Sequence, residues 1–432
     1  MDSIRNVLTT RGRAFVAAGV TLALSGIGFG FADLTRIGVL LTFLPMLAAV
    51  ASRRARPELS VLRVVHPSPL VVGQAATVEI ELHNATTRAL PVLVAREHVE
   101  YVLGDRPRFV IPRMDPGDRR EVTYPICCDV RGRHSLGPLR VRAGDPFGLS
   151  SVTSTVAGTT SVLVLPRVEP LGGGRPRGDG VGAEGAVPHM VALHGEDDVS
   201  IREYRDGDDL RRVHWPATAH QGELMVRQED RPARRRAVLV LDSRESAHAG
   251  RGPGGSFEWA VGALASIAAH LAHSAYAVHL VSTETVRDGL APQMLEPDVA
   301  LESLALAAEG SDVAFAEMMR AASPLTSAGG LVIAAVTDHD EQSLRQVAAL
   351  RQPGGTGLLL LLDTASFAAA RLGRPGRQGT PGRQGTPGNR SVALADLING
   401  AGWSTIVVRS GDTVASAWTA LNARGGVTAG VR

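Results

Sequence analysis

Two apolar segments near the N-terminus place the tightest constraint on how this chain folds. Residues 14–31 carry no charged side chain, and a second apolar run covers residues 37–51. A charge-free run of about 18 residues is long enough to cross a bilayer as a helix. Arginines precede the first run and follow the second, whereas the connecting residues hold only Asp33 and Arg36. By the positive-inside rule, residues 14–51 are predicted to form a two-pass membrane hairpin, with both ends and all later domains in the cytoplasm.

A cleaved signal peptide is the competing interpretation of this segment. The second apolar run and the arginines that follow it, Arg53, Arg54 and Arg56, favour the hairpin. Gly26 and Gly30 have the GxxxG spacing that allows two membrane helices to approach closely. This spacing suggests a glycine-mediated contact between the two helices.

Residues 57–168 show the alternation of apolar and polar residues that is typical of strands, as in ATVEIELHN and REVTYPICCDV. Short strands separated by turn-forming residues predict a β-sandwich. Residues 130–149 are expected to form two strands around Gly137-Pro138. The adjacent Cys127 and Cys128 should point to opposite faces of their strand, and two cysteines are too few for a disulfide framework. The region carries no active-site chemistry and is expected to be a spacer or a binding surface.

The charge balance argues against a nucleic-acid-binding protein. The formal net charge is +2, all 45 basic residues are arginine, and no basic run is interleaved with aromatic residues. Domains that bind nucleic acid concentrate basic residues on one face. We therefore expect no nucleic-acid partner.

Residues 237–432 alternate between apolar strand-like runs and helical stretches. The strand-like runs are AVLVLDS, AVHLVST, GLVIAAVTD, GLLLLLD and STIVVRS, and helices are expected at 257–274, 299–321, 340–351 and the C-terminus. This alternation predicts a mainly parallel sheet covered by helices on both faces. Ligands of such sheets bind at the carboxyl ends of the strands, where Asp242, Asp338 and Asp363 fall.

The segment REYRDGDDLRRVHWPATA, residues 202–219, holds the densest charge in the chain and is internally neutral between Arg202 and His214. One interpretation is catalytic: clustered carboxylates bind a divalent cation or act as acid and base, and His214 carries protons. The other is structural: each acid pairs with a nearby arginine, which lowers its pKa and occupies its lone pairs, and Trp215 is buried as an anchor. The close arginines favour the structural interpretation.

The longer run from Arg202 to Asp230 resembles the signature of the family known as domain of unknown function 58. The family pattern reads R-E-Y, then G-D, then R-x-[IV]-H-W, and then A-[RH]-x-G-x-L. The residues that match it are Arg202, Glu203, Tyr204, Gly207, Asp208, Arg211, His214, Trp215, Gly222 and Leu224. Two positions depart from the common pattern, since Pro216 stands where lysine is common and His220 where arginine is common.

The resemblance implies membrane anchoring, a C-terminal domain of the von Willebrand A type, association with MoxR-type AAA+ ATPases and no established enzymatic activity. A metal site of the von Willebrand A type would read D-x-S-x-S, with a later Thr-Asp. Asp242, Ser246 and the pair Thr337-Asp338 fit this pattern, but Arg244 stands in place of the first serine. Because a guanidinium only donates hydrogen bonds, we expect Arg244 to pair with Asp242 or Asp338. The divalent-metal site is then degenerate, and no cofactor is expected.

The predicted organisation has four parts. These are a transmembrane hairpin at 14–51, a β-sandwich at 57–168, a glycine-rich connector with the signature segment at 169–236, and a von Willebrand A-like α/β domain at 237–432.

The expected function is that of a membrane-anchored, non-enzymatic adaptor with protein partners. Its expected partner is a MoxR-type ATPase, in the assembly or maturation of envelope or other protein complexes. Two alternatives stay open. One is a metal-dependent hydrolase that uses Glu203, Asp208 and His214. The other is an extracellular adhesion module, which requires the inverted topology and a competent metal loop.

Overall fold

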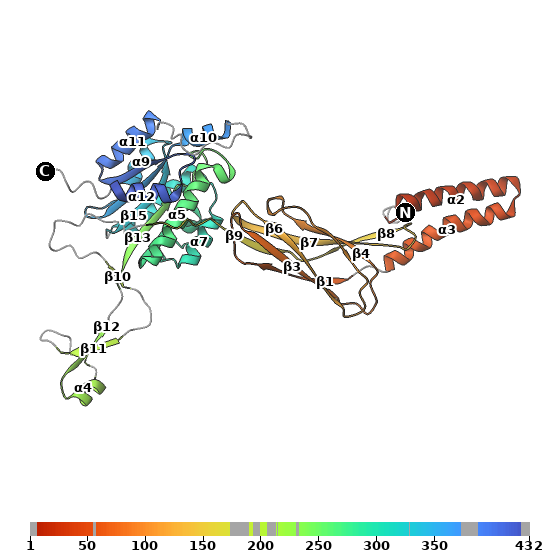
Figure 1. Cartoon of the computed structure of the whole chain (residues 1–432), viewed down its shortest axis with the longest axis horizontal. Helices are drawn as coiled ribbons and strands as arrows, with labels where there is room; N and C mark the ends of the chain where they lie inside the picture. The colour runs from red at the N-terminus through yellow and green to blue at the C-terminus, as the bar shows by residue number, and fades with distance from the viewer. Residues whose placement is uncertain are drawn as a thin grey trace. The chain divides into compact units, whose positions relative to one another are not determined.

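The computed structural model describes residues 7–54, 58–172, 190–192, 199–204, 213, 215–229, 233–327, 329–372 and 388–424. The chain forms two compact units, residues 1–165 and residues 166–432 (Figure 1). The first unit holds a helical hairpin and a β-sandwich, and the second holds the signature segment and an α/β domain.

The hairpin consists of α2 (Thr10–Phe29) and α3 (Ala32–Arg54). Both helices are long and apolar enough to cross a membrane. The structure confirms a helical hairpin, and of the two predicted glycines only Gly26 lies at a close contact between the helices. A Cβ atom added to Gly26 would lie 2.5 Å from the Thr35 hydroxyl, and one added to Gly38 would lie 2.4 Å from the backbone nitrogen of Ala23. Gly30 instead ends α2 in the left-handed conformation, with open space around it.

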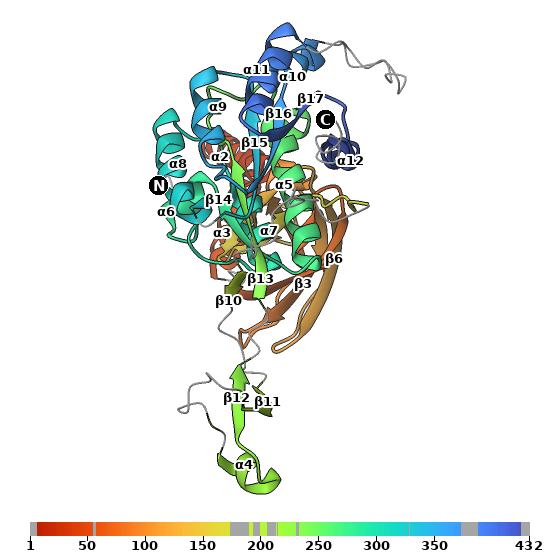
Figure 2. The ribbon, with the colours of Figure 1, turned by 90° about the vertical axis from the view of Figure 1, so that its left-hand side faces the viewer.

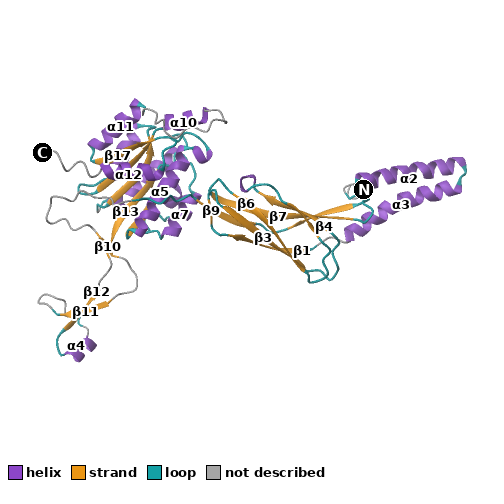
Figure 3. Cartoon of the chain, in the orientation of Figure 1, coloured by secondary structure: helices purple, strands orange, loops and turns teal. Residues whose placement is uncertain are grey.

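Two sheets form the predicted β-sandwich, whose strands are drawn in orange in Figure 3. The first sheet has the order β1-β3-β6, and the second has the order β2-β9-β7-β4-β5, with β8 also paired to β7. The strands are β1 (Leu59–His66), β2 (Leu70–Val71), β3 (Ala75–Asn84), β4 (Leu93–Val99), β5 (Arg108–Ile111), β6 (Arg119–Cys127), β7 (Gly132–Gly144), β8 (Ser151–Val156) and β9 (Thr160–Leu165). One apolar core lies between them, for example Ile80 of the first sheet with Leu93 and Val141 of the second.

Two details of the sandwich were predicted from the sequence, and one of them was wrong. Cys127 is exposed and Cys128 is buried, so the neighbouring cysteines do face opposite sides. The region around Gly137-Pro138 is a single strand, β7, and not two strands. This strand pairs with β9 before Gly137 and with β8 after Pro138, so the dipeptide marks a change of partner.

A buried ion pair joins the two sheets. The Arg63 Nε atom of β1 donates to Glu97 of β4 at 2.9 Å, and an Arg63 Nη atom donates to the Gly158 carbonyl at 3.2 Å. The side chains of Arg63 and Glu97 are 2% and 0% exposed. Burial raises the pKa of Glu97 above its ordinary value, although the hydrogen bond and the charge of Arg63 act in the opposite direction.

The α/β domain contains the mainly parallel sheet that the sequence predicts. Its parallel strands stand in the order β14-β13-β15-β16-β17, and β10 pairs antiparallel with the start of β13. The strands are β10 (Met190–Ala192), β13 (Ala233–Leu241), β14 (Tyr276–Val281), β15 (Leu331–Thr337), β16 (Thr356–Leu362) and β17 (Trp403–Val408).

Helices cover both faces of this sheet, and an apolar core lies on each side (Figure 2). One face is covered by α5 (Ser256–His273), α7 (Pro297–Leu306) and α12 (Val414–Arg424), and the other by α8 (Asp312–Thr326), α9 (Glu341–Ala348) and α11 (Asn389–Gly400). Two short helices, α6 (Thr283–Arg287) and α10 (Thr364–Leu372), follow β14 and β16.

The single helix predicted at 299–321 is wrong, because the structure has α7 and α8 there. The chain turns between them so that Gly310 can pair with the loop after β13. The Gly310 nitrogen donates to the Ser243 carbonyl, and the Glu245 nitrogen donates to the Gly310 carbonyl.

Candidate functional site

The carboxyl ends of β13 and β15 form the natural ligand position of this sheet. If the five parallel strands are counted along the chain from β13, their order in the sheet is 2-1-3-4-5. The sheet therefore grows in one direction from β13 to β14 and in the other direction from β15 to β17. Doubly wound sheets bind ligands at this switch in direction. Asp242 follows β13 and Asp338 follows β15, and both are buried.

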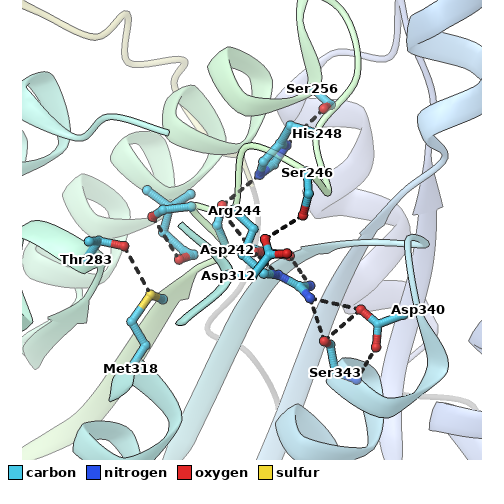
Figure 4. Close-up of polar contacts among 12 residues, drawn as sticks. Asp242, Arg244, Ser246, His248, Ser256, Thr283, Asp312, Met318, Asp340 and Ser343 are labelled. Carbon is cyan, nitrogen blue, oxygen red and sulfur yellow. Dashed lines mark hydrogen bonds and ion pairs between the residues drawn. The ribbon is translucent and has the colours of Figure 1, made fainter. Parts of the chain in front are cut away.

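An arginine guanidinium lies beside Asp242 (Figure 4). Arg244 Nε donates to Asp242 Oδ1 at 2.9 Å, and Arg244 Nη2 donates to Asp242 Oδ2 at 2.8 Å. This two-pronged geometry is among the strongest that a carboxylate can accept. The side chains are 7% and 0% exposed, so the pair is shielded from water. Of the two partners expected for Arg244, Asp242 and Asp338, the structure shows Asp242.

Arg244 also binds a second carboxylate, which the sequence analysis missed. Its Nη1 atom donates to Asp340 Oδ2 at 2.8 Å and to the Ser343 hydroxyl at 2.6 Å. Its guanidinium carbon lies 4.1 Å from the centroid of the Phe315 ring, a cation–π contact. Burial alone would lower the pKa of Arg244, but Asp242 and Asp340 outweigh it and raise the pKa, so Arg244 stays charged.

A local signal for Asp340 existed in the sequence. Asp340 is the N-cap of α9, and its side chain accepts from the Ser343 nitrogen three residues later. An aspartate placed immediately before a helical run is a common helix start. That pattern fixes the position of the carboxylate, but only the tertiary fold brings it to Arg244.

The pKa of Asp340 gives a prediction for the pH dependence of stability. Burial acts to raise this pKa, but the hydrogen bonds from Ser343 and the charge of Arg244 outweigh it and hold the pKa below the ordinary 3.8. A carboxyl with a lowered pKa in the folded state stabilises the protein above its unfolded pKa. This contribution should therefore be complete above about pH 4 and be lost as the pH falls through the folded value. We expect Asp340→Asn, which keeps a helix-capping side chain, to lower the melting temperature at pH 6 but not near pH 2. An equal difference at both pH values would contradict this assignment.

Asp338 does not pair with Arg244. Its Oδ1 atom accepts from the Thr364 nitrogen and hydroxyl, and its Oδ2 atom accepts from the Ser391 hydroxyl at 2.7 Å. The start of α10 and the first turn of α11 thus hold this carboxylate. Ser246, the third residue of the predicted metal set, is exposed and hydrogen-bonds with Asp312 at 2.5 Å.

These contacts do not fit a divalent cation of the von Willebrand A type. Such an ion needs oxygen ligands, whereas both oxygens of Asp242 accept from the Arg244 guanidinium. Within the part of the chain that the structure describes, no group of three or more His, Cys, Asp or Glu side chains is arranged for a metal ion. The arrangement instead holds a charge pair at the position of the degenerate metal site.

The signature segment forms a hairpin at its two ends. β11 (Val199–Glu203) pairs antiparallel with β12 (Met225–Glu229), which places Arg202 opposite Val226 and Glu203 opposite Met225. The Tyr204 nitrogen donates to the Leu224 carbonyl at 2.8 Å and continues this pairing.

Between these strands lies α4 (Trp215–Gln221). Gly222 follows the helix at φ 77°, a left-handed conformation that favours glycine and accounts for this signature position. The predicted burial of Trp215 is wrong, because its exposure is 67%. Four other signature residues, Gly207, Asp208, Arg211 and His214, lie outside the described residues.

One protein-family model matches the region that contains the signature segment. Residues 200–293 match the model of the family described as "Protein of unknown function DUF58". "Uncharacterized protein YeaD" of Bacillus subtilis (strain 168) is 28% identical to this chain over 157 residues. That match covers 35% of this chain and 37% of the length of YeaD.

Solved structures show only distant likeness. The CARDB domain of the PF1109 protein from Pyrococcus furiosus is 16% identical and covers 25% of this chain and 89% of that chain, with a TM-score of 0.19. The putative ApaA protein from Bordetella pertussis is 12% identical and covers 25% and 94%, also with a TM-score of 0.19. TM-scores this low establish neither a shared fold nor a shared function.

The family match agrees with the resemblance seen in the signature residues. It begins within β11 and extends through α4, β12, β13, α5, β14 and α6. Residues 200–293 of this chain are therefore a DUF58 domain, which comprises the signature hairpin and the first two parallel strands of the α/β sheet.

Proposed function

We propose that this protein is a membrane-anchored, non-enzymatic adaptor. In this proposal, a MoxR-type AAA+ ATPase is its partner in the assembly or maturation of envelope or other protein complexes. The soluble domains face the cytoplasm, where such an ATPase has access to ATP. The proposed partner class comes from the family resemblance of the signature segment, and the contacts below support a role in binding.

The exposure of Trp215 carries the proposal. A tryptophan side chain presents a large apolar surface, and leaving it 67% exposed forgoes the stabilisation that burial would give. Tryptophan is enriched among the residues that dominate the free energy of protein–protein binding. Trp215 lies at the start of α4, and Leu224, close in sequence, is also exposed. An exposed aromatic residue within a family signature is typical of a contact surface.

The Arg244 cluster supports a binding role over metal chemistry. Arg244 pairs with Asp242 and Asp340 together, so these two carboxylates are already partnered by a cation from the chain itself. A carboxylate held in this way is a poor general base and a poor metal ligand. The edge therefore has the character of a rigid support.

The apolar hairpin supports the anchor. Both helices have the length and composition of membrane spans. Arginines flank the outer ends, including Arg11, Arg13 and Arg53, and the positive-inside rule favours a cytoplasmic position for such ends.

The proposal predicts that Trp215→Ala impairs partner capture. The full-length protein is captured by affinity from its own membranes, and MoxR-type ATPases are sought among the bound proteins. Truncation of a binding hot spot weakens affinity by about 30-fold or more, so recovery of the ATPase should fall to background. The matched control is Tyr101→Ala, which removes an aromatic side chain of 93% exposure from the sandwich and should leave capture unchanged. Equal capture by both variants, or no ATPase with the wild-type protein, would contradict the proposal.

Metal-dependent hydrolysis that is lost in Asp208→Ala would instead support the hydrolase.

A further inference from the structure

The loop between β7 and β8 is tied to both ends of the helical hairpin. The Thr9 hydroxyl donates to the Gly148 carbonyl at 2.7 Å, and the Thr9 nitrogen donates to the Leu149 carbonyl at 3.0 Å. From the other helix, the Ser52 and Ser150 hydroxyls lie 2.8 Å apart. The loop at residues 145–150 therefore lies beside the start of α2 and the end of α3.

Close packing supports these hydrogen bonds. A Cβ atom added to Gly12 of α2 would lie 2.1 Å from the Leu149 carbonyl oxygen, so only glycine allows this approach. The Ser151 nitrogen also donates to the Val7 carbonyl at 2.8 Å. The contact between helix and loop is thus made by several backbone groups and not by one side chain.

Asp145 holds the loop in a fixed conformation. Its Oδ1 atom accepts from the Phe147 nitrogen at 2.8 Å, and its Oδ2 atom accepts from the Ser150 nitrogen and from the Ser150 hydroxyl. Burial acts to raise the pKa of Asp145, but the hydrogen bonds from Ser150, Phe147 and Leu149 outweigh it and lower the pKa. The carboxylate is thereby kept ionised to accept these bonds.

This fixed loop presents Phe147 to the outside. The side chain is 67% exposed, although the residues around it are held in place. Gly148 follows Phe147, and Arg11 Nη1 lies 3.9 Å from the position of a Cβ atom added to Gly148. The loop thus has an exposed aromatic side chain and a nearby arginine, a combination that suits the boundary between lipid headgroups and acyl chains.

The position along α2 places the loop at that boundary. The charge-free run begins at Ala14, and Thr9 precedes it by about 7.5 Å at 1.5 Å per helical residue. A hydrocarbon core that starts near Ala14 puts Thr9, and the loop bonded to it, at headgroup depth. We propose that the loop 145–150 is a membrane-interface contact, in which Phe147 inserts between lipid headgroups and fixes the sandwich against the membrane surface. This inference rests on the proposed membrane insertion of the hairpin.

The structure offers a matched control on the same sandwich. β4 pairs with β7 so that Leu93 lies opposite Ala143 and Val99 lies opposite Leu136. Tyr101 follows Val99 and therefore lies beyond the end of these strands that is remote from the loop. The separation along the strands is about 23 Å at 3.3 Å per residue.

The test uses tryptophan fluorescence of the full-length protein in phosphatidylcholine–phosphatidylglycerol vesicles. Phe147→Trp and Tyr101→Trp are compared after subtraction of the wild-type spectrum. Vesicles carry brominated lipids that quench tryptophan, with bromine either near the headgroup end or near the methyl end of the acyl chains. We expect the Phe147→Trp signal to be at least halved by the shallow bromines and less by the deep ones, with no quenching at Tyr101→Trp.

Two outcomes are separated by flotation of the same vesicles. If the protein floats with the lipid but Phe147→Trp is quenched no more than Tyr101→Trp, the interface contact is wrong and the anchor stands. If the protein does not float, the proposed membrane insertion itself fails. If the protein floats with the lipid and Phe147→Trp is quenched more than Tyr101→Trp, the membrane insertion of the hairpin and the interface contact are both supported.

Discussion

Replacing Arg244 with serine is expected to destabilise the α/β domain by about 3–5 kcal/mol. The variant leaves Asp242, whose side chain is 0% exposed, as a buried carboxylate without its cation. It also removes the bonds to Asp340 and Ser343 and the contact with Phe315. An uncompensated buried charge is one of the few single changes that cost this much. The measurement is the free energy of unfolding of this domain by denaturant, with the full-length protein in detergent.

The matched control for this variant is Arg345→Ser. Arg345 pairs with Glu341 on the neighbouring helix α9, but the two side chains are 68% and 48% exposed. Exposed pairs of this kind contribute about 0–1 kcal/mol. A loss of similar size in both variants would show that the Arg244 pair has no special role.

The same variant tests whether Arg244 takes the place of a metal ion. Removing the guanidinium frees the oxygens of Asp242, so calorimetry with Mg²⁺ and Mn²⁺ should show binding that is stronger in Arg244→Ser than in the wild-type protein. Micromolar binding by the wild-type protein, abolished in Asp242→Ala, would contradict this and would show the competent metal loop that the adhesion alternative requires.

Asp242 is one of the two partners, with Asp338, that the sequence predicts for Arg244. Asp242 ends an apolar strand and Arg244 lies two residues later, so one loop brings them together. The other partner of Arg244 could not be found in this way. Asp338 and Asp340 both follow β15, and the choice between them depends on where α9, α10 and α11 begin. Because Thr364 and Ser391 take Asp338, Asp340 is left for Arg244.

Other differences also arise from tertiary contacts that periodicity does not contain. The layers of the α/β domain follow from runs such as GLLLLLD, since buried parallel strands need apolar residues on both faces. The break between α7 and α8 reflects instead the bonds of Gly310 to a distant loop. Likewise, the apolar character of Trp215 predicted burial, but its side chain is exposed. An aromatic residue used for binding looks the same in sequence as one used for packing.

The second large effect is expected in the sandwich, where Glu97→Ala should destabilise the fold by about 3–5 kcal/mol. The Arg63 side chain is 2% exposed. Of the hydrogen bonds from its guanidinium to Glu97 and to the Gly158 carbonyl, only the bond to Gly158 remains in Glu97→Ala. Space for this side chain is limited on one side, since a Cβ atom on Gly137 would lie 3.1 Å from the Arg63 guanidinium carbon. The measurement is the denaturant midpoint of the sandwich transition.

Two further variants show whether the cost comes from the lone charge or from lost packing. Glu81→Ala removes the partner of Arg119 in the same sandwich, where the side chains are 37% and 71% exposed, and should cost less than about 1 kcal/mol. The double variant Arg63→Met/Glu97→Leu replaces both charges by apolar side chains of similar length. Buried ion pairs exchanged in this way are often neutral or stabilising, because the desolvation cost of both charges disappears. We therefore expect the double variant to recover most of the stability that Glu97→Ala loses. If it remains as unstable as the single variant, the contribution of Glu97 lies in packing between β1 and β4 and not in its charge.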